Sequence, residues 1–356
     1  MAEGAVSRRV LVSVEGVELP GDNAFGERVV VERSSDTAAL VQRGAELAAA
    51  GERVAVIASA RDLAATRNQL AHVAARRLAL VVHCLEDAAG APDPLAETGV
   101  SSALSLGDLP WGMLVAVGAA ESLDMSLVAR RAAEDSGCPF FVVHEKSERR
   151  RPELLVAPTR EIGESFLGGP RPPAPPEGSM RAVADRAPFA LASALREMES
   201  LSVRRLDVIE RVPSADAALA LLGFGSVGES MLTEVERLRA AGHDVSAIRV
   251  VAWRPFPGPR LVKALSRAGA VSVIDSAPRP LVGGGPLGIE LKAAFADALT
   301  WAPGYPGIGR IPRIVTGVSP PGRSLAADEV DALVDNMVAD ERGRRTFVFD
   351  RPSSRL

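Results

Sequence analysis

The sequence has 356 residues, of which 47% are hydrophobic and 24% charged, and its formal net charge is −4. This composition is typical of a folded protein of two or three domains, and the charge gives no electrostatic reason to expect nucleic acid binding. No apolar run approaches the roughly 20 residues of a membrane span, and the N-terminus shows no export signal, so we expect a cytoplasmic protein without a membrane segment.

The first half of the chain alternates apolar runs with helical patterns. The runs are almost continuously hydrophobic, which is typical of strands buried on both faces of a parallel sheet. The expected strands are residues 53–58, 78–83, 113–117 and 140–143. The expected helices are residues 37–50, 60–77 and 122–136. This order predicts βαβ units.

The middle of the chain changes in composition. A basic run at residues 146–151 is followed by a proline cluster at residues 170–176, which can neither propagate a helix nor donate to a sheet ladder. We expect a solvated linker there, followed by a helix over residues 188–198.

A second alternation of strands and helices begins near residue 217. Its expected strands are residues 217–222, 247–253, 271–274 and 313–316. Its expected helices are residues 230–241, 259–268, 288–299 and 326–339. The sequence therefore predicts an α/β protein with two doubly wound, largely parallel-sheet domains, at residues 1–150 and 211–356, joined by a proline-rich segment and connecting helix at residues 151–210.

A glycine-rich turn opens the second alternation. Residues 223–228 read Gly-Phe-Gly-Ser-Val-Gly, the spacing with which a strand-to-helix turn accepts a dinucleotide pyrophosphate. The next strand ends Trp253-Arg254-Pro255, without the carboxylate that would hold a ribose. Arg254 could instead hold a 2′-phosphate, and close packing of a helix on a sheet also calls for glycine. Nicotinamide binding is thus the less favoured interpretation.

The second half resembles a known domain in more than its glycines. Residues 253–257 read Trp-Arg-Pro-Phe-Pro, a strand ending in Asp275 follows, and a Gly-Gly-Gly-Pro-Leu-Gly stretch precedes a helix. This order is similar to the transketolase C-terminal-like domain of 2-oxoacid:ferredoxin oxidoreductases such as those acting on pyruvate. The ending at residues 345–350 (Arg-Thr-Phe-Val-Phe-Asp) also resembles that family's α subunit.

The first half resembles the pyrimidine-type, thiamine diphosphate-binding domain of the same family. The segment at residues 31–39 matches an element in which an acid is followed by small residues, and it places Asp36 where the family has glutamate. That carboxylate hydrogen-bonds the pyrimidine nitrogen and favours the imino tautomer that takes the thiazolium proton. The resemblance implies that Asp36 is catalytic and cofactor-binding, and Glu32 is a second possible cofactor contact. The local sequence equally predicts that Asp36 only caps the helix that follows.

The family's other catalytic parts are missing. The Tyr-Pro-x-Thr-Pro-Ser type loop that meets the 2-oxoacid has no match, nor does the arginine expected after the third strand, where residues 83–87 read His-Cys-Leu-Glu-Asp. This cluster is the densest group of possible metal ligands, but adjacent strand side chains point to opposite faces, so we expect no metal site in this chain. The first domain thus resembles a degenerate α subunit.

The resemblance implies partners. No Gly-Asp-Gly followed by Asn occurs at thiamine-motif distance, so a β-type thiamine diphosphate-binding subunit would hold the diphosphate and Mg²⁺. Cys84 and Cys138 are the two cysteines of the chain, too few for an iron–sulfur cluster, so electrons would leave through an iron–sulfur protein or ferredoxin. We therefore expect a hetero-oligomer in which this chain supplies the pyrimidine half of an interfacial site. The alternatives are a catalytically degenerate structural or regulatory subunit and, less favoured, a nicotinamide-dependent enzyme.

Overall fold

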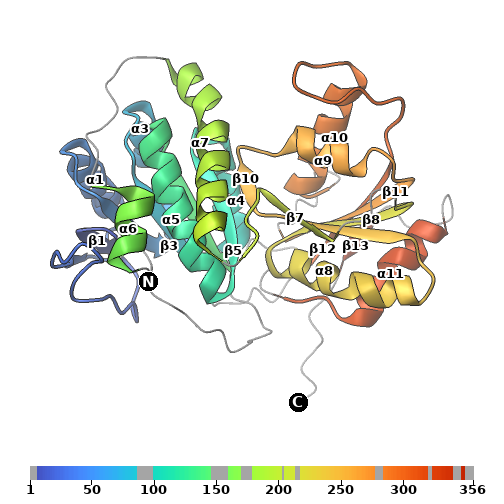
Figure 1. Cartoon of the computed structure of the whole chain (residues 1–356), viewed down its shortest axis with the longest axis horizontal. Coiled ribbons are helices and arrows are strands. Elements are labelled where there is room, and N and C mark those ends of the chain that lie inside the picture. The colour runs from blue at the N-terminus through green and yellow to red at the C-terminus, as the bar shows by residue number, and fades with distance from the viewer. Residues whose placement is uncertain are drawn as a thin grey trace.

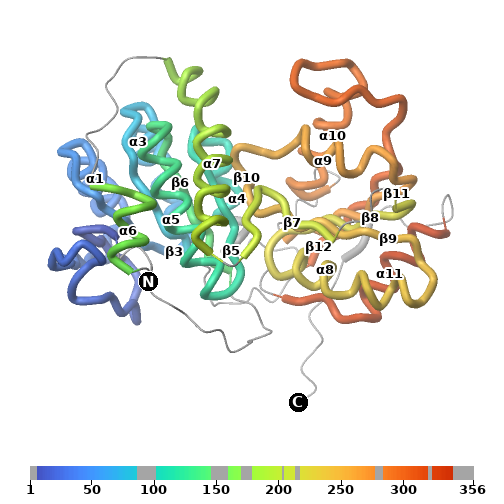
Figure 2. Tube along the Cα trace, in the orientation of Figure 1, coloured from blue at the N-terminus to red at the C-terminus, as the bar shows by residue number. Residues whose placement is uncertain are grey.

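The computed structural model describes residues 6–85, 99–145, 159–169, 179–202, 204–212, 217–276, 284–319, 323–339 and 346–348. Two lobes, each built on one sheet, lie side by side (Figure 1), and the chain passes from the first lobe to the second near β7 and β10 (Figure 2). The proline cluster and the basic run before it lie outside the described residues.

The first sheet has seven strands in the order β10-β5-β6-β4-β3-β1-β2. They are β10 (Ala252–Arg254), β5 (Gly112–Val117), β6 (Phe140–Glu145), β4 (Val81–Leu85), β3 (Val54–Ser59), β1 (Arg9–Val12) and β2 (Val30–Arg33). All pairs are parallel except β10 with β5, which is antiparallel. The parallel arrangement follows from apolar runs that are buried on both faces.

Helices cover both faces of this sheet. One face carries α1 (Thr37–Ala49), α2 (Ala60–Ala65), α3 (Arg67–Ala75) and α4 (Gly99–Ser105), with the short 3₁₀ helix η2 (Leu106–Asp108). The other carries α5 (Gly118–Ser136), α6 (Arg160–Leu167) and α7 (Met180–Leu201). The segment expected to connect the domains thus supplies two helices that pack on the first sheet.

The second sheet has six strands in the order β13-β12-β11-β8-β9-β7. They are β13 (Thr346–Val348), β12 (Arg313–Val318), β11 (Ala270–Asp275), β8 (Leu219–Phe224), β9 (Val245–Val250) and the antiparallel β7 (Ile209–Val212). Its helices are α8 (Gly225–Ala240) and α11 (Ala327–Val338) on one face, and α9 (Gly258–Leu265) and α10 (Pro286–Leu299) on the other. The predicted pair of doubly wound, largely parallel sheets is confirmed.

Several predicted elements have different limits. The expected strand over residues 247–253 is two strands, because the chain leaves the second sheet after Val250 and joins the first sheet at Ala252. The expected helix over residues 60–77 is broken at Thr66, and the helix expected from Pro188 begins at Met180, with the proline inside it. No helix in the described part of the chain has the length and apolar character that crossing a bilayer requires.

Candidate functional site

Asp36 lies at the carboxyl end of β2, an edge strand of the first sheet. Its Oδ1 accepts a hydrogen bond from the backbone N–H of Ala39 at 2.9 Å, so the helix cap predicted from the local sequence is confirmed. The residue is exposed, and its backbone N–H donates to the Ser34 hydroxyl at 3.1 Å. The carboxyl edge of a parallel sheet is where α/β proteins usually hold ligands. The Asp36 carboxylate is therefore exposed to solvent at the sheet edge where α/β proteins usually bind ligands.

Glu32, the second predicted cofactor contact, is half-buried within β2 and has other partners. Its two oxygens lie 3.1 Å from the Arg9 guanidinium and 3.5 Å from that of Arg43. The carboxylate is therefore neutralised by two arginines of its own chain, and its contacts differ from those of Asp36.

His83 and Cys84 are buried in β4, as expected of ordinary strand residues. His83 Nδ1 lies 2.8 Å from Nε2 of His144 on β6, and His144 Nδ1 lies 3.0 Å from the Ser122 hydroxyl. Burial, with the charge of His83 second, holds the pKa of His144 well below its usual value, and burial raises the pKa of the Cys84 thiol. Sequence reasoning missed this histidine pair because 61 residues separate its members.

No group of three or more potential metal ligands forms in the described part of the chain. Glu86 and Asp87, the other two possible ligands in the sequence cluster where no metal site was expected, lie outside the described residues.

The glycine turn at residues 223–228 is filled by the protein itself. The Glu145 carboxylate, at the end of β6 in the other sheet, accepts from the backbone N–H of Ser226 at 3.0 Å and from its hydroxyl at 2.7 Å. A Cβ on Gly228 would lie 2.6 Å from Arg249 Cγ, which shows how closely α8 packs on β9. The turn thus serves packing, and its helix N-terminus already holds a carboxylate.

Arg254, the alternative 2′-phosphate contact, also has partners within the chain. Its Nε donates to the carbonyl oxygen of Gly107 at 2.7 Å, and a terminal nitrogen lies 2.6 Å from the Glu290 carboxylate. The guanidinium carbon lies 4.1 Å from the Trp253 ring centroid. These contacts, with the filled turn, argue against nicotinamide binding.

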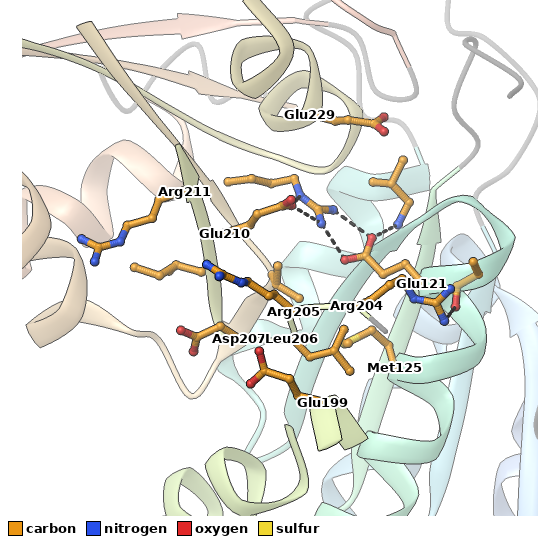
Figure 3. A pocket seen from close by; sticks show the side chains of 15 residues that line it. Glu121, Met125, Glu199, Arg204, Arg205, Leu206, Asp207, Glu210, Arg211 and Glu229 are labelled. Carbon is orange, nitrogen blue, oxygen red and sulfur yellow. Dashed lines mark hydrogen bonds and ion pairs between the residues drawn. The ribbon is translucent and has the colours of Figure 1, made fainter. Parts of the chain in front are cut away.

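A cavity of about 590 Å³ lies where the two lobes meet. It is lined mainly by charged side chains (Figure 3). Arg249 makes two hydrogen bonds to the Glu121 carboxylate, at 2.9 and 2.6 Å, and a third to Glu210 at 2.8 Å. Among the other lining residues, Arg204 pairs with Asp124. Most of the charge in this cavity is therefore compensated within the chain.

Comparison with known proteins finds a protein family that matches part of the second lobe and relatives that match more of the chain. Residues 217–309 match the family described as pyruvate:ferredoxin oxidoreductase core domain II. Pyruvate synthase subunit PorA of Pyrococcus furiosus is 24% identical over 201 residues, which are 48% of this chain and 50% of that protein. The same subunit of Methanothermobacter thermautotrophicus is 25% identical over 263 residues, 62% of this chain and 67% of that protein.

The predicted resemblance is confirmed: the chain is similar to a subunit of 2-oxoacid:ferredoxin oxidoreductases. It spans half the length of the Pyrococcus furiosus relative.

Two solved structures share the fold. The 2-oxoglutarate:ferredoxin oxidoreductase of Magnetococcus marinus has a TM-score of 0.56 at 13% identity, covering 95% of this chain and 62% of that one. A split-gene transketolase, solved as an inactive β4 tetramer, has a TM-score of 0.54 at 16% identity, covering 96% and 98%. At these identities the likeness concerns the fold alone.

Proposed function

We propose that this chain is the α-type subunit of a 2-oxoacid:ferredoxin oxidoreductase and contributes the Asp36 edge to a thiamine diphosphate site shared with a partner chain. The observation that carries the proposal is the match of residues 217–309 to a domain of pyruvate:ferredoxin oxidoreductase, together with the PorA relatives. Oxidative decarboxylation of a 2-oxoacid such as pyruvate would be the reaction of the assembled complex.

Asp36 is suited to contact the pyrimidine half of thiamine diphosphate. Asp36 uses Oδ1 to cap α1 and is exposed, so it can also accept from or donate to a pyrimidine nitrogen presented by a partner. When bound, thiamine diphosphate would supply the nucleophilic chemistry needed at the 2-oxo group, and Asp36 would hold its pyrimidine half. The part played by this chain is to hold a proton at the ring nitrogen through Asp36.

The diphosphate half would belong to the partner. The described residues gather no set of metal ligands, and the glycine turn that could accept phosphate holds Glu145. A β-type subunit would therefore bring the diphosphate and Mg²⁺. Because Cys84 and Cys138 are the only cysteines of the sequence, an iron–sulfur protein or ferredoxin would receive the electrons.

A catalytically degenerate subunit is the second candidate. Asp36 is one methylene shorter than the glutamate of the family it resembles, and a displacement of about 1 Å in a positioned acid can cost on the order of 100-fold in rate. Glu32 is bound to two arginines and so offers no substitute.

Variants of Asp36 in the assembled complex test the proposal and separate capping from catalysis. Asparagine caps a helix about as well as aspartate, so Asp36→Asn should fold normally while 2-oxoacid-dependent reduction of a viologen dye falls about 100-fold or more. Asp36→Ala should lose both this activity and about 1 kcal/mol of stability. Asp36→Glu restores the length that the resemblance implies and should retain or increase activity.

Equal activity of the wild type and Asp36→Asn would remove Asp36 from the mechanism and favour the degenerate subunit. The matched control is Ser59→Ala, which removes the hydroxyl that caps α2 through the backbone N–H of Asp62. This control should cost similar stability and leave the activity intact.

A further inference from the structure

The N-terminus of α8 is closed by a carboxylate that comes from the other lobe. Glu145 ends β6 of the first sheet, lies 81 residues before Ser226, and is only 6% exposed. Its two oxygens accept from the backbone N–H and the hydroxyl of Ser226, which is itself fully buried. An anion at this place is stabilised by the free N–H groups and the dipole of the helix.

The fit between carboxylate and turn explains one glycine of the motif. A Cβ on Gly225 would lie 1.5 Å from Oε2 of Glu145, so no side chain can be added while the carboxylate is in place. Gly225 also has a φ of +50°, which other residues rarely adopt. The glycine therefore gives the carboxylate of the opposite lobe access to the helix N-terminus.

The second glycine-rich turn of this lobe has the same arrangement. Asp275, at the end of β11, accepts from the backbone N–H groups of Leu287 at 2.8 Å and Gly288 at 3.2 Å. A Cβ on Gly285 would lie 2.2 Å from Asp275 Cγ. This contact stays within the second lobe, whereas that of Glu145 joins the two lobes.

The contact between Glu145 and Ser226 lies at the joint between the two lobes, where other interactions also connect them. The backbone N–H of Val115 donates to Val251 at 2.8 Å, and β10 extends the first sheet with residues of the second half of the chain. One hydrophobic cluster runs from Val56 in the first sheet to Leu222 in the second. Glu145 therefore reaches α8 across a joint of fixed geometry.

We propose that Glu145 acts as an internal anion that holds the first lobe on α8 and occupies the glycine turn, so that a phosphate-bearing ligand cannot bind there while the carboxylate is in place. The glycine turn at residues 223–228 then binds a side chain of its own chain, Glu145. A partner subunit would meet a preformed two-lobe surface.

Hydrogen exchange and thermal unfolding of the full-length chain test the lock. In Glu145→Gln, which keeps the size of the side chain and removes its charge, the first-turn amides of α8 should exchange about tenfold faster, because a charge-assisted hydrogen bond is lost. The first turn of α10, held by Asp275, should exchange as in the wild type. Unchanged exchange at α8 would overturn the proposal.

Glu145→Ala, which empties the turn, provides the second measurement. Inorganic pyrophosphate should raise its unfolding midpoint in a concentration-dependent way and leave the wild type unaffected at matched ionic strength. Ser226→Ala is the control, because it removes one hydrogen bond but leaves the carboxylate in place, and it should not respond. An equal response of wild type and Glu145→Ala would show that Glu145 does not close the turn. A folded Glu145→Ala without response would also contradict the proposal.

Discussion

Trp253 forms the centre of the joint between the lobes, and its removal is expected to cost a large part of the stability. The side chain is 2% exposed and packs edge to face against Phe224 and Phe256, with ring centroids 5.1 and 5.6 Å apart. A Cβ on Gly107 of the first lobe would lie 2.4 Å from its indole nitrogen. The indole therefore fills the space between η2 and the second sheet, and the joint depends on its volume.

Truncation of a buried tryptophan to alanine typically costs about 3–5 kcal/mol. Since folded proteins have a total stability of roughly 5–15 kcal/mol, Trp253→Ala should lose a large part of it. The indole nitrogen of Trp253 is buried without a hydrogen-bond partner in the described structure. Trp253→Phe keeps most of the ring and removes this unsatisfied donor, so it should cost clearly less than the alanine variant.

Urea unfolding followed by far-UV circular dichroism gives the free energy of unfolding of each variant. Trp301, which is 77% exposed, provides a matched control, and Trp301→Ala should change this free energy by no more than about 0.5 kcal/mol. If Trp253→Ala lost no more than Trp301→Ala, the indole would not hold the joint and the account of a single packed core across both lobes would be refuted.

Three further outcomes are expected. Burial lowers the pKa of His144, so the folded state resists the proton that the unfolded chain takes up below about pH 6.5. Its contribution to stability is full above that pH and falls by up to about 1.4 kcal/mol per unit below it; urea unfolding against pH should show this slope in His72→Gln and a weaker one in His144→Gln. Burial raises the pKa of Cys138 to about 11 and that of Cys84 still further, so at pH 8 both thiols should be alkylated much more slowly in the native than in the urea-unfolded protein; equal rates would contradict their burial. Asp275→Ala leaves two buried amides at α10 unpaired and should cost on the order of 2–6 kcal/mol in urea unfolding, whereas a loss below 1 kcal/mol would show that water replaces the carboxylate.

The sheet architecture could be predicted because parallel strands are buried on both faces. The runs over β3 and β5 contain no polar residue before their last position, and each is followed by a helical pattern. β1, which is largely buried between β3 and β2, was not predicted from the sequence.

The joint between the lobes could not be predicted. The run from Ala247 to Trp253 is apolar apart from Arg249, and its pattern does not show that the chain changes sheets at Val251. Strand pairing is a contact between distant segments, and periodicity reports only which faces are buried. For the same reason nothing near Glu145 in the sequence indicated that its carboxylate would reach Ser226.

Of the candidate site, only the helix cap formed by Asp36 could be predicted from the sequence. The small residues after Asp36 and the acid itself are a helix-cap signal, which the structure confirms. Under the proposed function, the same carboxylate would meet a pyrimidine ring presented by a second chain, and the residue pattern of one chain does not record how two chains meet.

The proposed role as an oxidoreductase subunit can be tested by recovering the tagged full-length chain from its native cells and analysing the bound material by mass spectrometry and a thiamine assay. We expect a partner with a Gly-Asp-Gly thiamine motif, an iron–sulfur protein, and thiamine diphosphate in stoichiometric amount. Recovery of the chain alone, or with partners that carry neither thiamine nor an iron–sulfur cluster, would contradict its role as an oxidoreductase subunit.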